Sequence, residues 1–164
     1  MSEQSPIVKQ AWDALQTGKC AEAETLFINA FEQDPSDLSL LVGLGKSMMG
    51  RGAWSDAVET FKMVLTVEQS EDQQSQQAHS VYSELAECYY QLKETSSWLN
   101  AAQQSLNFTT PTVELLVTFA SRLSRIDQTS EALRYLNRAL RIDERDERIH
   151  RIFAEIYLKT GDRQ

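Results

Sequence analysis

Cysteine and histidine, which commonly build catalytic, metal or redox centres, are scarce in this sequence of 164 residues. Its only cysteines are Cys20 and Cys88, which we expect to be small buried apolar residues rather than a disulfide or a redox pair. Its only histidines, His79 and His150, lack a histidine or cysteine at helical spacing that would complete a metal site. The glycines do not form a phosphate-binding loop, and no serine stands in a nucleophile elbow. We therefore predict no catalytic residue, no metal, no cofactor and no enzymatic activity.

Proline, glycine and long apolar runs are also scarce. Three prolines and six glycines leave few breaks for helices, and nothing in the sequence indicates strands. No apolar run approaches the length of a membrane span, and the first residues, Met-Ser-Glu-Gln-Ser-Pro, carry no signal segment. The composition predicts a soluble helical protein, cytoplasmic by default and without membrane insertion.

Positive charge is in deficit, with 16 Lys and Arg against 24 Asp and Glu and a formal net charge of −8. This charge disfavours nucleic acid and anionic lipid as partners. Residues 1–78 carry 5 basic against 12 acidic side chains, a balance of −7, whereas residues 79–164 carry 11 against 12, a balance of −1. Between Arg134 and Arg145, arginines alternate with acidic residues at helical spacing, which predicts a salt-bridged surface exposed to solvent.

What the sequence does contain is a repeat of 34 residues, seen where Gly18, Ala23 and Phe27 recur as Gly52, Ala57 and Phe61. After Phe61 the register slips by seven residues and then resumes. Small residues at the recurring positions allow two helices to touch closely, and large ones fill the gap to the next pair. The recurring segments are Leu41-x-x-Leu44-Gly45-x-x-Met48, Tyr82-x-x-Leu85-Ala86-x-x-Tyr89, Leu116-x-x-Phe119-Ala120-x-x-Leu123 and His150-x-x-Phe153-Ala154-x-x-Tyr157.

These spacings resemble the tetratricopeptide repeat, over about four and a half repeats. The resemblance implies an all-α fold, a right-handed α-solenoid of tetratricopeptide helix pairs with a C-terminal capping helix. We expect a single domain over residues 1–164. Its repeats are expected at about 4–37, 38–71, 79–112 and 113–146, and the capping helix at about 147–160.

The third repeat departs from this pattern in two ways. Trp98 stands where alanine is usual and Ala102 where an aromatic residue is usual, which we interpret as a volume-conserving exchange with Trp98 facing the core. The register slip falls in a polar, glutamine-rich stretch at residues 66–79. Because the segment from Ser70 resembles a capping box, we expect the next helix to begin near Glu71 and overhang its neighbours. A disordered loop is the alternative, and an overhang would be either a solvated extension or a partner-specific contact.

In tetratricopeptide proteins, the first helices of successive repeats line a concave groove that typically holds a peptide or a partner helix. Transferring those positions predicts a groove that is apolar at its N-terminal end and basic at its C-terminal end. The expected lining residues are Val8, Trp12, Leu15, Val42, Lys46, Met49, Glu87, Tyr90, Val117, Ser121, Arg125, Arg148, Arg151 and Glu155.

Within this set, Trp12, Met49 and Tyr90 are of the types that anchor partners, because they bury a large area and carry a polar or polarizable group. Trp12 has a second interpretation of equal weight, in which it packs against the neighbouring helix as an N-terminal cap. The arginines at the other end, Arg125, Arg148 and Arg151, are suited to grip a carboxylate.

The resemblance also allows one family function to be tested against the sequence. Co-chaperones of this family hold acidic chaperone tails with a clamp of Lys, Asn and Arg, but the matching residues here are Val8, Trp12, Gly43, Ser80 and Glu84. Glu84 would repel a carboxylate, so binding of that type is not expected.

The prediction is therefore a noncatalytic protein–protein interaction or scaffold module whose partner is a protein or peptide with an apolar and an acidic segment. Two alternatives stay open. The chain is the N-terminal repeat region of a longer enzyme of the glycosyltransferase or sulfotransferase type, or it is a self-assembling repeat scaffold.

Overall fold

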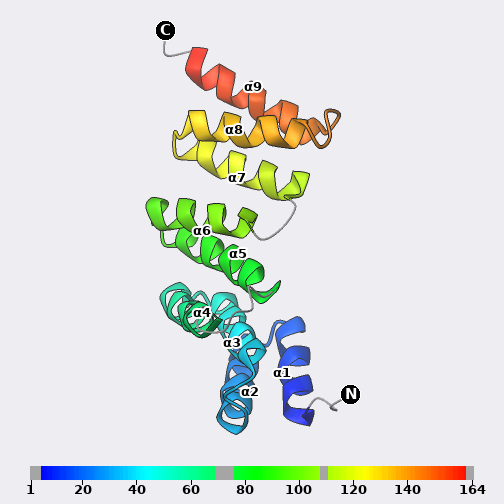
Figure 1. Cartoon of the computed structure of the whole chain (residues 1–164), viewed down its shortest axis with the longest axis vertical. Coiled ribbons are helices and arrows are strands. Elements are labelled where there is room, and N and C mark those ends of the chain that lie inside the picture. The colour runs from blue at the N-terminus through cyan, green and yellow to red at the C-terminus, as the bar shows by residue number, and fades with distance from the viewer. Residues whose placement is uncertain (1–4, 69–75, 108–110, 162–164) are drawn as a thin grey trace. The chain divides into compact units, whose positions relative to one another are not determined.

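The computed structural model of the protein describes residues 5–68, 76–107 and 111–161. Within these ranges every regular element is an α-helix (Figure 1). The helices are α1 (Pro6–Gln16), α2 (Cys20–Gln33), α3 (Leu38–Gly50), α4 (Trp54–Glu68), α5 (Gln76–Gln91), α6 (Thr95–Asn107), α7 (Val113–Arg125), α8 (Thr129–Leu140) and α9 (Glu147–Gly161). None of these helices is long and apolar enough to cross a membrane.

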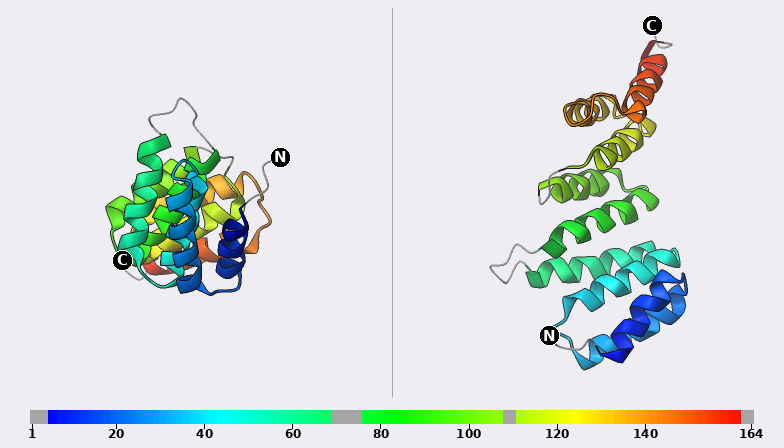
Figure 2. Two further views of the ribbon diagram at one scale, coloured as in Figure 1. Left: turned by 90° about the horizontal axis from the view of Figure 1, so that it is seen from below. Right: turned by 90° about the vertical axis from the view of Figure 1, so that its right-hand side faces the viewer.

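Contacts divide the chain into two compact units, an N-terminal unit (Met1–Thr109) that holds α1–α6 and a C-terminal unit (Thr110–Gln164) that holds α7–α9. In the N-terminal unit, each odd-numbered helix packs against the next helix in the chain, so that α1, α3 and α5 are the first helices of three pairs. The first helices also contact one another, α1 with α3 and α3 with α5, and Figure 2 shows the pairs stacked in chain order within this unit.

One turn geometry joins the first helix of each pair to the second. The residue at the turn has a left-handed backbone, with φ of 76° at Gly18, 77° at Gly52, 62° at Lys93 and 59° at Asp127. The N–H of the next residue then donates to the carbonyl oxygen five positions earlier, at 2.9–3.0 Å. This left-handed turn is a common way to end an α-helix. Glycine adopts it without steric cost, because it has no Cβ.

The core of the N-terminal unit explains why small residues recur. A Cβ added at Gly45 would lie 2.6 Å from Cε1 of Phe61, and one added at Gly43 would clash with Phe27. The two glycines therefore let α3 approach the phenylalanines of two second helices. Trp98 is 1% exposed, which confirms the prediction that it faces the core.

Two helix starts are fixed by side chains. Asp37 Oδ1 accepts the N–H of Ser39 at 3.0 Å before α3, and Thr112 Oγ1 accepts the N–H of Leu115 at 3.2 Å before α7. Both satisfy backbone donors that a helix leaves unpaired at its N-terminus. The capping box expected from Ser70 and the helix start expected near Glu71 lie outside the described residues.

In the C-terminal unit, α7 pairs with α8, and α9 contacts both. One face of α9 buries Ile149, Ile152 and Ile156. Near its end, Lys159 Nζ donates to the Ser124 carbonyl oxygen at 3.0 Å. The helix thus reaches α7 through an apolar stripe and one charge-assisted hydrogen bond.

Candidate functional site

Eight of the residues expected to line a groove lie on the first helices of the N-terminal unit. Seven of them are half-buried, which leaves part of each side chain accessible: Val8, Trp12, Leu15, Lys46, Met49, Glu87 and Tyr90. Val42 is only 9% exposed and offers little surface. Because α3 contacts both α1 and α5, these side chains belong to neighbouring helices of one unit, and we refer to the seven as the first-helix surface.

Two aromatic side chains of the first-helix surface rest on core aromatics. The Trp12 ring meets Phe27 of α2 edge-on, with centroids 4.9 Å apart at an interplanar angle of 78°. The Tyr90 ring lies 6.0 Å from the ring of Trp98 on α6. Trp12 therefore does pack against a neighbouring helix, as its second interpretation required. Both rings are held in place on one side, which reduces the entropy that a partner would have to remove on binding.

Two charged side chains of the first-helix surface have partners that lie just outside it. Lys46 Nζ lies 3.1 Å from Glu84 Oε1, and the two side chains are 35% and 25% exposed. Glu87 Oε1 accepts a hydrogen bond from Gln91 Nε2 at 2.8 Å. The sequence placed Lys46 in the groove and treated Glu84 as a separate repulsive group, and it gave no signal that they pair between α3 and α5. The remaining character of this surface is apolar, from Val8, Leu15 and Met49.

The six expected groove residues of the C-terminal unit behave differently from one another. Val117 is 7% exposed and Ser121 is half-buried, whereas Arg125, Arg148, Arg151 and Glu155 are exposed. Both arginines of α9 have carboxylates beside them. Arg151 Nε lies 3.9 Å from Glu155 Oε1, one helical turn away.

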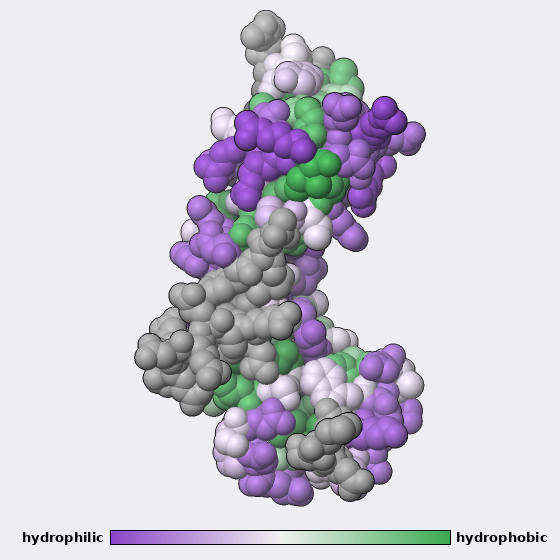
Figure 3. Space-filling model, turned by 45° about the vertical axis from the view of Figure 1, so that its right-hand side comes forward, coloured by the Kyte–Doolittle hydropathy of each residue, from purple (hydrophilic) through white to green (hydrophobic). Residues whose placement is uncertain are grey.

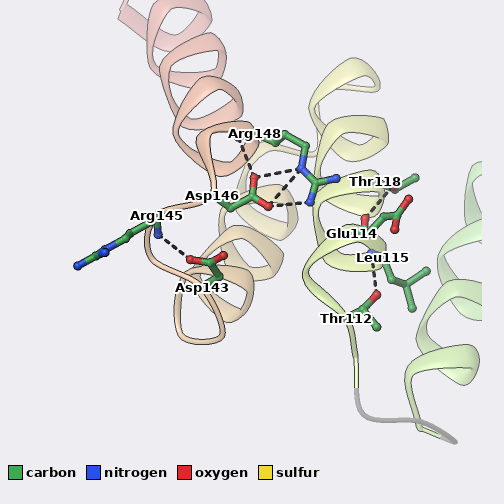
Figure 4. Close-up of polar contacts among 8 residues, drawn as sticks. All are labelled: Thr112, Glu114, Leu115, Thr118, Asp143, Arg145, Asp146 and Arg148. Atoms are coloured by element: carbon green, nitrogen blue, oxygen red, sulfur yellow. Dashed lines mark hydrogen bonds and ion pairs between the residues drawn. The ribbon is translucent and has the colours of Figure 1, made fainter.

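Arg148 grips Asp146 with two nitrogens (Figure 4). Its Nε donates to Oδ1 at 3.0 Å and its Nη2 to Oδ2 at 2.7 Å, while its backbone N–H also donates to Oδ1 at 2.9 Å. The hydrogen bonds from Arg148 hold the pKa of the Asp146 carboxyl below its usual value, and the same pair raises the pKa of Arg148, with a smaller contribution from Glu114. The grip that the sequence predicted for a partner's carboxylate is thus made here with a carboxylate of the chain itself.

The N-terminal unit also contains a pocket of about 450 Å³ between α4, α5 and α6. Its wall combines apolar side chains with hydroxyl, amide and ammonium groups: Lys62, Leu65, Tyr82, Leu85, Tyr89, Ser96, Ser97, Asn100 and Ala101. Lys62 Nζ donates to Glu59 Oε1 at 3.0 Å, and this bond, followed by Tyr89, raises the pKa of the Lys62 ammonium. The sequence did not predict these residues as a site. They come from one or two turns of each of three helices, and no sequence motif connects such separate stretches.

The remaining titratable candidates carry no sign of reactive chemistry. Cys88 is fully buried, and burial, followed by Glu84 and Glu87, raises the pKa of its thiol to about 12. No group of three or more metal-binding side chains occurs among the described residues. Cys20 is half-buried and, like Cys88, is a free thiol.

Comparisons with known proteins agree with this architecture. A family model described as Tetratricopeptide repeat protein 21 ARM repeat matches residues 40–163. The crystal structure of MamA superposes with a TM-score of 0.78 at 16% identity, over 97% of this chain and 86% of that one. A tetratricopeptide repeat protein from Parabacteroides merdae ATCC 43184 gives 0.79 at 18% identity, over 95% of this chain and 59% of that one.

The fold also recurs inside a larger assembly protein, since a chain of the APC/C hetero-tetramer Cut9-Hcn1 gives a TM-score of 0.75 at 18% identity, over 92% of this chain and 29% of that one. No curated protein sequence matches the chain. Repeat proteins of this type generally mediate protein–protein interactions and are typically noncatalytic scaffolds. The chain belongs to the family described as Tetratricopeptide repeat protein 21 ARM repeat, and its fold class is the all-α solenoid of tetratricopeptide helix pairs.

Proposed function

We propose that the protein is a noncatalytic interaction module and that the first-helix surface of its N-terminal unit binds an apolar segment of a partner protein. The single observation that supports this proposal is the partial exposure of three large side chains, Trp12, Met49 and Tyr90. All three are half-buried, and the two rings are each steadied by a core aromatic. Large side chains that are partly exposed yet fixed in place are the usual anchors of protein interfaces.

The pairing of charges supports an apolar rather than an acidic ligand for this surface. The Lys46 ammonium already has the Glu84 carboxylate at 3.1 Å, so an incoming carboxylate would have to compete for it. In the C-terminal unit, Arg148 and Arg151 also have carboxylates beside them. Of the three arginines expected to bind an acidic segment of the partner, this leaves Arg125. The proposal therefore assigns most of the binding energy to the apolar residues of the first-helix surface.

The test starts from a peptide library, which requires no assumption about the partner. Sequences selected on the full chain are synthesised, and their affinities are measured by fluorescence polarisation for three chains: wild type, Met49→Glu and Met63→Glu. Met63 is a matched control, because it is a methionine of the same unit that is 54% exposed on the second helix α4. We expect Met49→Glu to weaken binding by at least about tenfold, equivalent to about 1.4 kcal/mol, and Met63→Glu to leave it unchanged.

Two results would overturn the proposal. If both glutamate variants bind selected peptides as well as wild type does, the first-helix surface is not the binding site. If Met63→Glu alone loses binding, the partner lies on the second-helix side of the unit. Circular dichroism of all three chains shows whether any loss reflects unfolding instead, and an unfolded Met49→Glu is replaced by Met49→Gln.

A further inference from the structure

We propose that the pocket between α4, α5 and α6 is a second binding site, which takes an uncharged, extended peptide segment of a partner protein and holds one of its apolar side chains. We refer to it as the α4–α6 pocket. It lies within the N-terminal unit, where α5 packs against both α4 and α6 and lies between them (Figure 1). Its volume of about 450 Å³ falls within the range of ligand pockets, about 300–1,000 Å³. Its wall shares no residue with the first-helix surface, so this site is separate from the function proposed above.

The third repeat has two tyrosines in the wall of this pocket where neighbouring repeats have leucine or methionine. Tyr82 and Tyr89 of α5 are both half-buried. At the same distances before the left-handed turn residue, α3 has Leu41 and Met48, and α7 has Leu116 and Leu123. These three leucines are at most 4% exposed. The third repeat therefore brings two phenol groups to positions that the neighbouring repeats keep apolar.

The preceding helix pair shows what fills the equivalent space elsewhere. Thr60 of α4 is 7% exposed, and its Oγ1 donates to Met48 Sδ at 3.4 Å. The same two positions in the third repeat hold Ala101 and Tyr89, and both line the pocket. Alanine lacks the methyl and hydroxyl groups of threonine, which leaves space beside the tyrosine. The pocket is thus a feature of this repeat rather than of the repeat pattern.

The pocket has an apolar floor to which all three helices contribute. Leu65 of α4 is half-buried, whereas Leu85 of α5 and Ala101 of α6 are 3% and 4% exposed. An apolar side chain that contacts this floor leaves water, which favours binding. On the face drawn in Figure 3, hydrophobic groups of the N-terminal unit lie among hydrophilic ones, so hydropathy alone does not mark a site there. The combination of a concave shape with an apolar floor is what marks this one.

The rim that α6 contributes is neutral, although the equivalent residues of other second helices are charged. Where α6 has Ser97 and Asn100, α4 has Asp56 and Glu59, and α8 has Glu131 and Arg134. Asn100 is exposed, and its side chain makes no hydrogen bond within residues 5–68, 76–107 and 111–161. Its amide offers donors and an acceptor together. A peptide group, which carries one donor and one acceptor, complements it.

The charges at the pocket favour an uncharged ligand. Lys62 is the one charged side chain in the described wall, and its Nζ already donates to Glu59 Oε1 at 3.0 Å. The Ser97 hydroxyl donates to Glu94 Oε2 at 3.1 Å. An acidic ligand would have to compete with Glu59 for the ammonium, and a basic ligand would be repelled by it. An uncharged segment meets neither cost.

The exposure of the rim favours a peptide over a small molecule. Lys62, Ser96 and Asn100 are all exposed, so the pocket opens to solvent along α4 and α6. Pockets for small molecules usually bury about 70–90% of the ligand surface, which an open site does not provide. An extended peptide instead continues past the rim and gains contacts there. It also points alternate side chains to opposite sides, so one of them can enter the pocket.

The test uses a displayed library of short peptides that contain no Asp, Glu, Lys, Arg or His. Peptides are selected on the full chain, and their affinities are measured by fluorescence polarisation. We expect a class of these peptides to lose at least about tenfold in affinity on Asn100→Glu, which places in α6 the residue that α4 has here. Gln103→Glu is the matched control, because it adds the same charge to an exposed position of α6 outside the pocket wall. It should leave the affinity unchanged.

Two further variants locate the peptide. Ala101→Thr adds the groups that fill this position in α4, so it should weaken the same peptides several-fold. Met49→Glu, on the first-helix surface, should leave them unchanged, which separates this site from the one proposed above. When such a peptide is titrated into the wild-type chain, NMR shift changes of backbone amides should concentrate in α4, α5 and α6. Circular dichroism of each variant checks that it is folded.

The proposal fails on any of three results. If no selected peptide is weakened by Asn100→Glu, the pocket takes no segment of this kind, and peptides lost only on Met49→Glu belong to the first-helix surface. If light scattering shows self-association of the wild type that Asn100→Glu abolishes, the occupant is a second copy. If replacing residues 69–75 by glycine and serine creates peptide binding that the wild type lacks, the pocket belongs to the chain's own segment.

Discussion

Helices α7 and α9 carry the same signature in the same unit, yet only one of them buries it. Ala120 of α7 is fully buried, whereas Ala154, 34 residues later, is exposed. The two helices differ in their next neighbour along the chain, since α8 covers α7 and no described helix covers α9 in the same way. The comparison teaches that a repeat signature encodes a surface to be covered, and that burial depends on the helix that completes the pair.

The largest expected effect comes from leucine-to-alanine changes in the two helices. Leu123 on α7 is fully buried, so Leu123→Ala should lower the free energy of unfolding by about 2–5 kcal/mol through lost transfer energy and a cavity. Leu158 on α9 is 70% exposed, and Leu158→Ala should change it by less than about 0.5 kcal/mol. Urea denaturation followed by circular dichroism measures both. Similar losses for the two variants would remove the contrast between the helices.

The next largest effect on stability is expected from replacing the repeat alanine of each helix with a larger residue. Ala120→Leu forces extra methyl groups into the packed α7–α8 contact and should cost about 1–3 kcal/mol. Ala154→Leu adds the same groups to a surface that is open, so we expect a change within about 0.5 kcal/mol. Thermal unfolding of the two variants is the measurement. A cost at Ala154 as large as that at Ala120 would mean that the side of α9 that carries Ala154 is covered in solution.

A smaller effect is expected from the hydrogen bond that joins α9 to α7. Lys159 Nζ donates to the carbonyl oxygen of Ser124 at 3.0 Å, and Lys159→Met keeps the apolar stem while it removes this bond. We expect a loss of about 1 kcal/mol in the free energy of unfolding, typical of a hydrogen bond that water can partly replace. Arg151→Met, at an exposed site with a carboxylate 3.9 Å away, serves as the control and should be nearly neutral. Equal effects would show that the bond to Ser124 is not specific.

The next prediction uses thiol reactivity and should leave stability almost unchanged at neutral pH. In a Cys20→Ser background, Ala154→Cys should react with a thiol reagent at the rate of an unfolded peptide, because the site is exposed. Cys88 is the internal reference. Burial raises the pKa of its thiol from 9.0 to about 12, so it stays protonated and should react only on unfolding. Rapid labelling of Cys88 in the native chain would contradict its burial.

The same thiol gives a pH dependence with a definite sign. The folded pKa of Cys88 lies above its unfolded value, so the unfolded state releases its proton first as the pH rises. The contribution of Cys88 to stability is therefore complete below pH 9 and is lost between pH 9 and about 12. Cys88→Ala should flatten the stability profile in this range, which urea denaturation at several pH values would show.

Much of the fold could be predicted from the sequence, because the repeat pattern is local and recurs. The turns after the first helices are encoded by Gly18 and Gly52, and the inward position of Trp98 is set by its register against Ala57. The turns that lack a glycine could not be predicted from the repeat pattern. Lys93 and Asp127 adopt the same left-handed turn as the glycines, although neither residue type marks it in the sequence.

The site was less predictable, because exposure depends on neighbours that the register does not name. Val42 and Val117 stand at groove positions, yet both are under 10% exposed. Lys46 and Glu84 pair across two helices, which spacing within one helix cannot indicate. The sequence predicted a capping helix at about 147–160, but it could not indicate how exposed that helix is, because His150 and Tyr157 match the signature whether or not a second helix is present.

Hydrogen exchange of the unmodified full chain tests the central claim most directly, by comparing amides of α7 with those of α9. If α9 is a first helix with an uncovered face, its amides should exchange through local opening, at least about tenfold faster than those of α7, which must await opening of the α7–α8 pair. Equal protection of the two helices at concentrations where the chain is monomeric would contradict the account.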